Sequence, residues 1–294
     1  MPAARAALIA LAVGLLAQPA QAFRVGIVNP TPVPAAISAE LGSSVQRYDL
    51  TWPGPTEFVT APDTTAVLAL RTESGHYYAK DAPAFCAWVN QVLAHPVPYV
   101  IIGNEPRRAD TAGYVATLRA CAPLVRAHGA KVVGPGLHPA GPVTYLWPII
   151  DAIATGCRGC LDVVDFHPYW YSSLGYDAAI VAHVRQVFGN LPVWITEDGE
   201  RSSVAGDAYQ AQQVGLDIAA ARCAGVAVWM NFMLNDAGSW SSGLLTDKGI
   251  RKPAFDAFAR AARSAPPCPK QMPPPPRAGR FTNAVHQGQT GRIR

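Results

Sequence analysis

Two glutamates in this 294-residue sequence follow apolar runs that are typical of buried strands. The run YVIIGNEP (99–106) ends on Asn104 and Glu105 before a proline, and the run PVWITEDGE (192–200) reaches Glu197. A carboxylate at the end of a buried strand costs free energy unless it is paired, hydrogen-bonded or protonated, and functional sites are where such costs are tolerated. Cleavage of a glycosidic bond requires two carboxyl groups, one on either side of the bond. The two glutamates therefore predict acid/base and nucleophilic chemistry on a sugar.

Eight apolar, β-rich runs alternate with helical stretches and would have to position these glutamates. Several runs are continuously hydrophobic, as expected for parallel strands that are buried on both faces. Eight β-then-α units within residues 23–265 predict an α/β protein with one domain, a (β/α)8 TIM barrel. The runs are 23–30, 44–52, 66–73, 99–106, 131–139, 162–170, 192–200 and 226–233.

A doubly wound open sheet would show the same alternation and is the alternative architecture. That fold commonly carries a Gly-rich phosphate loop after its first strand. The first run and its continuation, FRVGIVNPTPVP (23–34), contain no GxGxxG, which favours the barrel. The Pro-rich stretch 53–65 is the weakest of the helical predictions.

Polar side chains gather at the C-terminal ends of the expected strands, where the βα loops of a barrel form its pocket. Strands four and seven lie three apart in a ring of eight, so Glu105 and Glu197 are expected to meet across the mouth. The other polar side chains at strand ends are Arg47, Asp49, Arg71, Glu73, Asn104, His138, Asp165, His167, Asp198 and Asn231.

Two terminal segments differ from the barrel in composition. Residues 1–22 hold Arg5, an apolar run too short to span a bilayer and a small-x-small site, AQA (20–22), which predict a signal peptide cut after Ala22. A retained membrane anchor is the alternative. Residues 266–294 are rich in Pro, Gly, Gln and Arg and predict a disordered tail. We expect a secreted, extracellular protein with no other membrane span. The tail is expected to be inert, with contact to an anionic cell surface as the alternative.

The basic net charge of +4 comes from these terminal segments. They hold six of the 24 basic residues and no acidic one, so 18 basic residues remain against 20 acidic residues in 23–265. The folded part is therefore slightly acidic, and no nucleic-acid partner is expected.

Six cysteines in an exported chain predict disulfides, for which about fifteen pairings exist. Cys157 and Cys160 form a CRGC unit. A small loop bridge is favoured there over a zinc site, because a second pair at zinc-ribbon spacing is missing. The remaining candidate pairs, in successive helices and around the last helix, are Cys86–Cys121 and Cys223–Cys268.

The motifs YVIIGNEP, DFHPYW, PVWITEDGE and KGIRKPAFDAF resemble those of clan A retaining glycoside hydrolases, which are TIM barrels with Asn-Glu on strand four and Glu on strand seven. The resemblance spans nearly all of residues 23–262, without pointing to one family. RYDLTW (47–52) is also similar to the Arg-x-Asp-x-x-Trp found after strand two in some exported members.

Carried over residue by residue, the resemblance implies Glu105 as acid/base and Glu197 as nucleophile. It also implies five substrate-binding or supporting residues: Asn104 on the sugar 2-hydroxyl, Arg47 beside the nucleophile, Tyr169 touching it, His167 on the same wall, and Trp229 as a sugar-stacking floor. This sequence departs from the pattern where Asp198 directly follows the nucleophile. Strand alternation places Val193, Ile195 and Glu197 on one face and Asp198 on the other.

The resemblance implies double displacement on an oligo- or polysaccharide, with no cofactor and no metal. A monomer is expected, because nothing in the sequence indicates a larger assembly. Short connections around the barrel favour an open cleft and internal cleavage. Trp170, Tyr171 and Trp240 are further candidates for sugar platforms, with loop packing as the alternative.

Two other interpretations stay open. A metal-dependent barrel hydrolase would use His138, Asp165, His167 and Asp198 as ligands, although no HxH lies on the first strand and no HExxH occurs. A non-catalytic carbohydrate-binding barrel would keep the fold without the chemistry. A structural ion pair is the alternative role for Glu105, and Asp198 and Glu200 are the rivals of Glu197 for the nucleophile.

Overall fold

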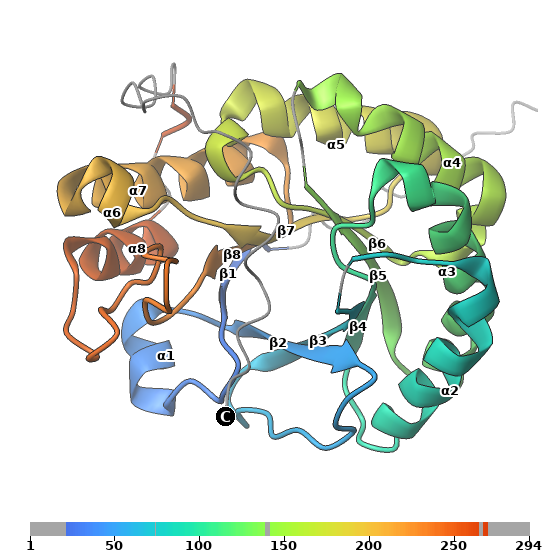
Figure 1. Ribbon diagram of the computed structural model, residues 1–294. Coiled ribbons are helices and arrows are strands. Elements are labelled where there is room, and N and C mark those ends of the chain that lie inside the picture. Colours follow the sequence, from blue (N-terminus) through green and yellow to red (C-terminus); the bar gives the residue numbers. More distant parts are fainter. Residues whose placement is uncertain (1–21, 74, 139–141, 265–266, 270–294) are drawn as a thin grey trace, which may run out of the picture.

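The chain forms a closed barrel of eight parallel strands, paired in the order β1 to β8, with helices forming an outer ring (Figure 1). The computed structural model describes residues 22–73, 75–138, 142–264 and 267–269. The predicted signal peptide and the tail beyond residue 269 lie outside these residues. The predicted (β/α)8 TIM barrel is confirmed, and the open sheet is excluded because β1 pairs with β8.

The strands and helices alternate along the chain. The strands are β1 (Arg24–Val28), β2 (Val45–Trp52), β3 (Thr65–Thr72), β4 (Tyr99–Ile102), β5 (Lys131–Leu137), β6 (Val163–Phe166), β7 (Val193–Asp198) and β8 (Val228–Phe232). The α-helices in the described ranges are α1 (Ala35–Leu41), α2 (Ala82–Val92), α3 (Thr111–Ala127), α4 (Trp147–Cys157), α5 (Leu174–Phe188), α6 (Ser202–Ala205), α7 (Asp207–Ala224) and α8 (Pro253–Arg263).

Prolines decide where several helices begin and where one is missing. The first turns of α2, α4 and α8 each contain a proline, which is tolerated there because its missing N–H would have no helical partner. Between β2 and β3 no helix forms within the described residues. Pro53, Pro55 and Pro62 interrupt that stretch, for which the helical prediction is weakest, since an interior proline breaks the hydrogen-bond ladder.

Two apolar layers hold the barrel. The outer layer packs the strands against the helices, and the inner layer fills the barrel. Each fully buried Val or Leu contributes about 1.5–3 kcal/mol relative to an exposed one. The next inward positions above this apolar floor are polar, Arg47 on β2, Asp165 on β6 and Thr196 on β7. The inner layer consists of Val28, Val45, Val67, Ala69, Ile101, Val133, Val163, Trp194, Ala227, Val228 and Met230.

A bulge near the end of β7 changes which way its last residues face. Ile195 pairs with Trp229 and Asp198 pairs with Asn231, so β7 uses one more residue than β8 over this interval. Such a bulge re-aims a side chain. Glu197 therefore turns into the mouth, away from the side of Ile195, whose side chain packs in the outer layer. Asp198 faces outward, so the two acids do lie on opposite sides, as expected.

The six cysteines form three disulfides, Cys86–Cys121, Cys157–Cys160 and Cys223–Cys268, which confirms the candidate pairs. In the part of the chain that the structure describes, every helix is too short or too polar to cross a bilayer.

Candidate active site

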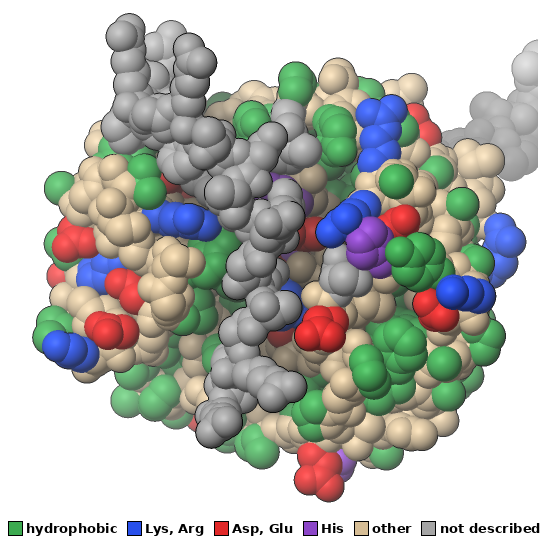
Figure 2. Space-filling view, in the orientation of Figure 1, with side chains coloured by type: hydrophobic (Ala, Val, Ile, Leu, Met, Phe, Trp, Pro, Cys, Tyr) green, Lys and Arg blue, Asp and Glu red, His purple; other side chains and the backbone are tan. Residues whose placement is uncertain are grey.

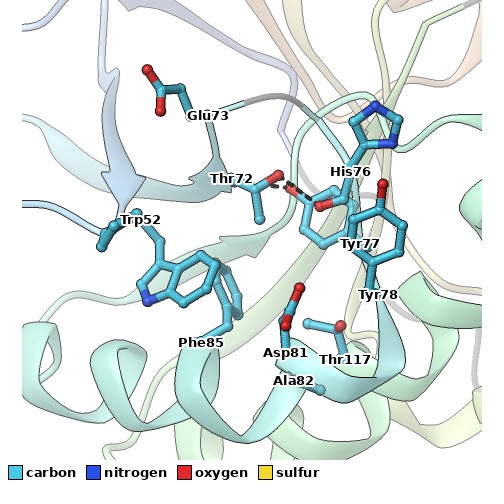
Figure 3. Close-up of a pocket in the computed structure, with 11 residues that line it drawn as sticks. Trp52, Thr72, Glu73, His76, Tyr77, Tyr78, Asp81, Ala82, Phe85 and Thr117 are labelled. Carbon is cyan, nitrogen blue, oxygen red and sulfur yellow. Dashed lines mark hydrogen bonds between the residues drawn. The ribbon is translucent and has the colours of Figure 1, made fainter.

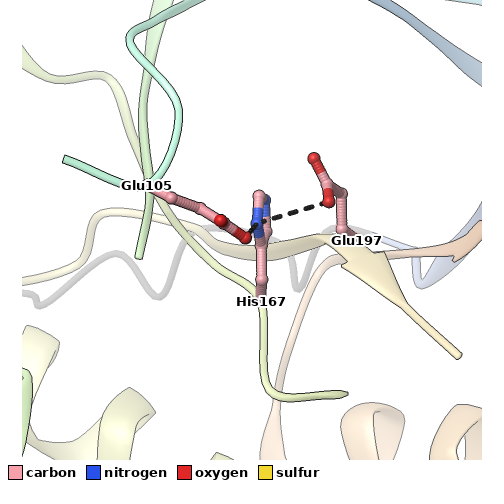
Figure 4. A group of neighbouring side chains, drawn as sticks. All are labelled: Glu105, His167 and Glu197. Carbon is pink, nitrogen blue, oxygen red and sulfur yellow. Dashed lines mark hydrogen bonds and ion pairs between the residues drawn. The ribbon is translucent and has the colours of Figure 1, made fainter. Parts of the chain in front are cut away.

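The structure brings Glu105 and Glu197 together at the mouth of the barrel, on either side of His167 (Figure 4). Ligand atoms of these three side chains all lie within 4.8 Å of one another. Glu105 belongs to the loop after β4, His167 follows β6, and Glu197 lies on β7. Figure 2, in the same orientation as Figure 1, shows acidic and basic side chains next to one another near the centre of this face.

Backbone geometry aims Glu105 into the mouth. Strand β4 ends at Ile102, earlier than expected, and Gly103 follows with φ of 89°, where a Cβ would lie 2.5 Å from the ring of Tyr114. Glu105 itself has φ of 45°, and its N–H lies 3.2 Å from the carbonyl oxygens of both Pro135 and Gly136. A left-handed backbone outside glycine costs about 1–3 kcal/mol and is concentrated at functional sites.

Arg47 and Tyr169 hold Glu197 from two sides. Arg47 Nη2 lies 2.6 Å from Glu197 Oε1, and the hydroxyl of Tyr169 donates a hydrogen bond to Oε2. Tyr169 is the other described non-glycine residue with positive φ, at 43°. Burial lowers the pKa of Arg47, but the charges of Asp49, Glu197 and Asp165 together with the hydrogen bond to Asp49 outweigh it and raise the pKa, so the guanidinium stays charged. Glu197 thus lies beside a fixed cation and accepts a hydrogen bond from Tyr169.

Asn104 is oriented by the same arginine. Its Oδ1 accepts from Arg47 Nη2 at 2.7 Å, and its backbone N–H donates to the hydroxyl oxygen of Tyr77 at 2.9 Å. With Oδ1 engaged, the Nδ2 group is the part of Asn104 that can donate to a sugar hydroxyl.

His167 links the second glutamate to a buried polar network. Its Nδ1 lies 3.1 Å from Glu105 Oε1, and its Nε2 lies 3.1 Å from Thr196 Oγ1, whose hydroxyl donates to Asp165. Arg47 Nη1 is also 3.1 Å from Nε2 and donates to Thr196 Oγ1 at 2.9 Å, so Arg47 and His167 meet at this hydroxyl.

This network sets the pKa values of His167 and Glu105. Burial lowers the pKa of His167, but the charges of Glu197 and Asp165 and the hydrogen bonds to Asp165 and Glu105 outweigh it and raise the pKa to about 10. For Glu105, burial raises the pKa, but the hydrogen bond from His167 and the charges of His138, His167 and Arg47 bring it below its usual value. The proton between Glu105 and His167 therefore lies on Nδ1 of the histidine.

The set of metal ligands weighed from sequence is not assembled. Asp165 accepts from the N–H and the hydroxyl of Thr196 inside the barrel, whereas Asp198 accepts from Trp229 on the outer side. In the described residues the group with metal-ligand spacing is Glu105, His167 and Glu197.

Trp229 is not part of this group, which corrects the expected sugar-stacking floor. Its side chain is fully buried, its ring lies 6.0 Å from that of Phe258 on α8, and its Nε1 donates to Asp198 Oδ2 at 2.9 Å. Trp229 therefore packs between the barrel and the helices and cannot reach a substrate in the mouth.

Other aromatic side chains lie beside Tyr169 instead. The ring of Trp240 is 6.2 Å from Tyr169 and 5.4 Å from Phe232, and the guanidinium of Arg201 lies 3.8 Å from the centre of the Trp240 ring. Trp240 is among the weaker platform candidates from sequence. The sequence did not point to three residues of this region, Phe232, Thr196 and Arg201. Phe232 and Thr196 nevertheless occupy inward positions of their strands.

Solved structures with the same fold include several glycoside hydrolases. A family 39 glycoside hydrolase from the gut symbiont Bacteroides cellulosilyticus aligns with a TM-score of 0.66 at 16% identity, covering 82% of this chain and 64% of the other. A monomeric β-xylosidase from Caulobacter crescentus aligns with a TM-score of 0.59 at 13% identity, covering 81% and 67%. An endo-β-1,3-glucanase of glycoside hydrolase family 128 from Sorangium cellulosum aligns with a TM-score of 0.53 at 17% identity, covering 81% and 98%.

These similarities establish the fold, a closed barrel of eight parallel strands, which the glycoside hydrolases named above share. The chain spans about two thirds of the length of the first two of these enzymes. No protein-family profile and no curated protein sequence matches the chain.

Proposed function

We propose that the protein is a retaining glycoside hydrolase that cleaves a polysaccharide by double displacement. The observation that carries the proposal is the pair of carboxylates from the loop after β4 and from β7, whose oxygens come within 4.8 Å of each other. Retaining enzymes place their carboxyl groups about 5–5.5 Å apart, whereas inverting enzymes need about 6.5–9.5 Å for a water molecule. The glycoside hydrolases that share the fold support the same class.

The environment of each glutamate assigns its role. Glu197, fixed by Arg47 and Tyr169, attacks the anomeric carbon, and the glycosidic C–O bond breaks as the new ester bond forms. Glu105 protonates the leaving oxygen. In the second half, Glu105 takes a proton from a water molecule, whose oxygen attacks the anomeric carbon and releases Glu197. Asn104 Nδ2 donates to the 2-hydroxyl of the sugar.

The proton that Glu105 delivers comes from His167. Proton transfer from His167 Nδ1 to Glu105 Oε1, 3.1 Å away, leaves a neutral carboxyl group and a neutral imidazole. The imidazole keeps its proton on Nε2, which donates to Thr196 Oγ1. The pair thus holds one proton over the pH range in which an isolated glutamate would already be ionised.

We also infer where and in what form the enzyme acts: as a secreted monomer that cleaves internal bonds of an extracellular polysaccharide without a cofactor. The three disulfides support an oxidising compartment.

The test is release of reducing ends from β-1,3-glucan, β-1,4-xylan and β-1,4-mannan by wild type, Glu105→Ala and Glu197→Ala, with and without a chelator. We expect each variant to lose about 10²–10⁴-fold in activity, independently of chelator. Asp198→Asn is the matched control, because its carboxyl is adjacent in sequence but faces outward. Proton NMR of the first product should show retention at the anomeric carbon. Inversion, or activity that disappears with chelator alone, would contradict the proposal.

A further inference from the structure

A cavity of about 210 Å³ lies at the rim of the barrel, outside the ring of strands and close to the candidate active site. It opens between the ends of β2 and β3 and the start of α2, on the same face as the mouth (Figure 3). Pockets for drug-sized ligands measure about 300–1,000 Å³, so this volume fits a smaller group, of the size of one sugar ring. Its walls include Trp52, Glu73, Tyr77, Tyr78, Asp81 and Phe85.

One wall of the cavity is an exposed aromatic ring held in a fixed orientation. Tyr78 is 49% exposed, yet its ring is stacked on that of His76, with centres 5.6 Å apart and planes at 6°. His76 Nδ1 is in turn 2.6 Å from Asp110 Oδ2, at the start of α3. A half-exposed tyrosine gains little stability from such fixing, whereas a binding site gains a preorganised apolar face.

The opposite wall and the rim supply the remaining elements of carbohydrate recognition. Trp52 lies across the cavity from Tyr78 (Figure 3), and its ring is fixed edge-on by Phe85 at 6.1 Å. Flat aromatic faces suit the C–H faces of sugars. Glu73 and Asp81 line the same cavity, and in the described part of the chain no ion pair or side-chain hydrogen bond engages either carboxylate. Free carboxylates accept from sugar hydroxyls and repel anions.

The cavity is joined to the catalytic mouth through Tyr77. Its hydroxyl oxygen accepts from the N–H of Asn104 at 2.9 Å and from that of Thr72 at 3.4 Å. A Cβ on Gly75 would lie 3.5 Å from the carbonyl oxygen of Glu105, so the loop that borders the cavity also borders the mouth. The cavity and the mouth are therefore neighbours that share one bordering loop.

We propose that this cavity is a second carbohydrate-binding site, which takes an uncharged sugar unit of the polysaccharide outside the catalytic mouth. Tyr78 and Trp52 provide the stacking faces, and Glu73 and Asp81 accept hydrogen bonds from hydroxyl groups. The two carboxylates exclude uronic acid units. The inference rests on the proposed function for the identity of the polymer, but binding at the cavity does not depend on turnover.

Binding is measured in the Glu197→Gln background by retardation in native gels that contain β-1,3-glucan, β-1,4-xylan, β-1,4-mannan or polygalacturonate. We expect retardation by at least one of the neutral polymers and none by polygalacturonate. Tyr78→Ala and Glu73→Ala should each weaken this binding about five- to tenfold, a loss of about 1–1.4 kcal/mol. Tyr78→Phe should retain it, because it keeps the ring. Tyr209→Ala, a partly exposed tyrosine on α7 across the barrel from α2, is the matched control (Figure 1).

In the active enzyme, Tyr78→Ala should lower the ratio of kcat/KM on the polymer to kcat/KM on an aryl glycoside about fivefold. Binding that is lost in Tyr78→Ala and Glu73→Ala while wild type hydrolyses nothing would support this site and contradict the proposed function. The second site would be overturned if Tyr78→Ala and Tyr209→Ala were retarded equally in the gels. The same holds if neither variant were retarded.

Discussion

Two groups of buried carboxylates lie on opposite sides of β7. They differ in how the cost of burying a negative charge is offset. On the inner side, Glu197 is compensated by the guanidinium of Arg47 and by the hydroxyl of Tyr169. On the outer side, Asp198 lies near Asp177 on α5 and Asp217 on α7, all of them buried. Among the described residues, no cation is one of the main contributions to the pKa of these three aspartates.

The outer group instead favours the protonated form of its acids. Burial raises the pKa of Asp198 to about 7, although the indole N–H of Trp229 opposes this. Burial, and then the charge of Asp198, raises the pKa values of Asp177 and Asp217 well above their usual range. One strand thus separates a carboxylate with a charged partner from a group of acids whose pKa values are raised. The β7 bulge decides which acid belongs to which group.

The largest effect is expected from removing the cation of the inner group. Arg47→Met leaves Glu197 and Asp49 without their buried partner, so kcat/KM on an aryl glycoside should fall at least about 10³-fold, or about 4 kcal/mol. The free energy of unfolding should fall by about 3–5 kcal/mol, measured by urea denaturation. Arg71→Met is the control. Arg71 also pairs with Asp49, but at the longer distance of 3.8 Å and with a side chain that is one-third exposed. Comparable losses in both variants would mean that Arg47 has no special role.

A large shift in the pH profile is expected from breaking the Glu105–His167 pair. In wild type, kcat/KM should hold its plateau until His167 deprotonates, near pH 10. His167→Gln removes the shared proton, so the basic limb should move several pH units lower, towards the pKa of a lone glutamate. A wild-type basic limb already below pH 6 would show that the histidine proton is not shared.

The outer group predicts that stability falls as pH rises. A buried acid with a raised pKa binds its proton more tightly in the folded state than in the unfolded state. Its contribution to the free energy of unfolding is therefore complete at pH values below the unfolded-state pKa, and it is lost as the pH rises from there to the folded-state pKa. For Asp198 this window runs from about pH 4 to about pH 7. The raised pKa of His167 acts in the same direction between about pH 6.5 and about pH 10.

Asp177→Asn tests this in thermal unfolding at pH 5 and pH 8. Neither carboxylate oxygen of Asp177 has a hydrogen-bond partner among the described residues, so an amide of the same shape should shrink the fall in Tm between the two pH values by a few degrees. Asp162→Asn, at a partly exposed aspartate paired with Arg126, is the control. An unchanged pH dependence would mean that Asp177 is already neutralised in another way.

The smallest effect is expected for Trp229→Phe. It removes the hydrogen bond to Asp198 and should lower the free energy of unfolding by about 1–3 kcal/mol while KM on polysaccharide changes less than twofold. A KM increase of tenfold with unchanged stability would restore Trp229 to the substrate-binding surface.

The fold and the composition of the mouth could be predicted from sequence because eight apolar runs and the polar residues that end them are local signals. The orientation of side chains on β7 and β8 could not. Both strands are buried on both faces, so the alternation that assigns a face is absent: Val228 and Met230 face inward and Trp229 outward, with no difference in polarity. The bulge at Glu197 leaves no mark of its own in the sequence. The outer aspartates come from separate elements and meet only in the folded chain.

The disulfide between Cys223 and Cys268 has a mechanical consequence. It joins α7 to the residues just after α8 and encloses β8 and α8 in a covalent loop with a sequence separation of 45. A force applied to the chain beyond Cys268 therefore enters the barrel through α7, and α8 carries none of it. With the bridge reduced, the same pull would act on α8 directly and peel it from the barrel first.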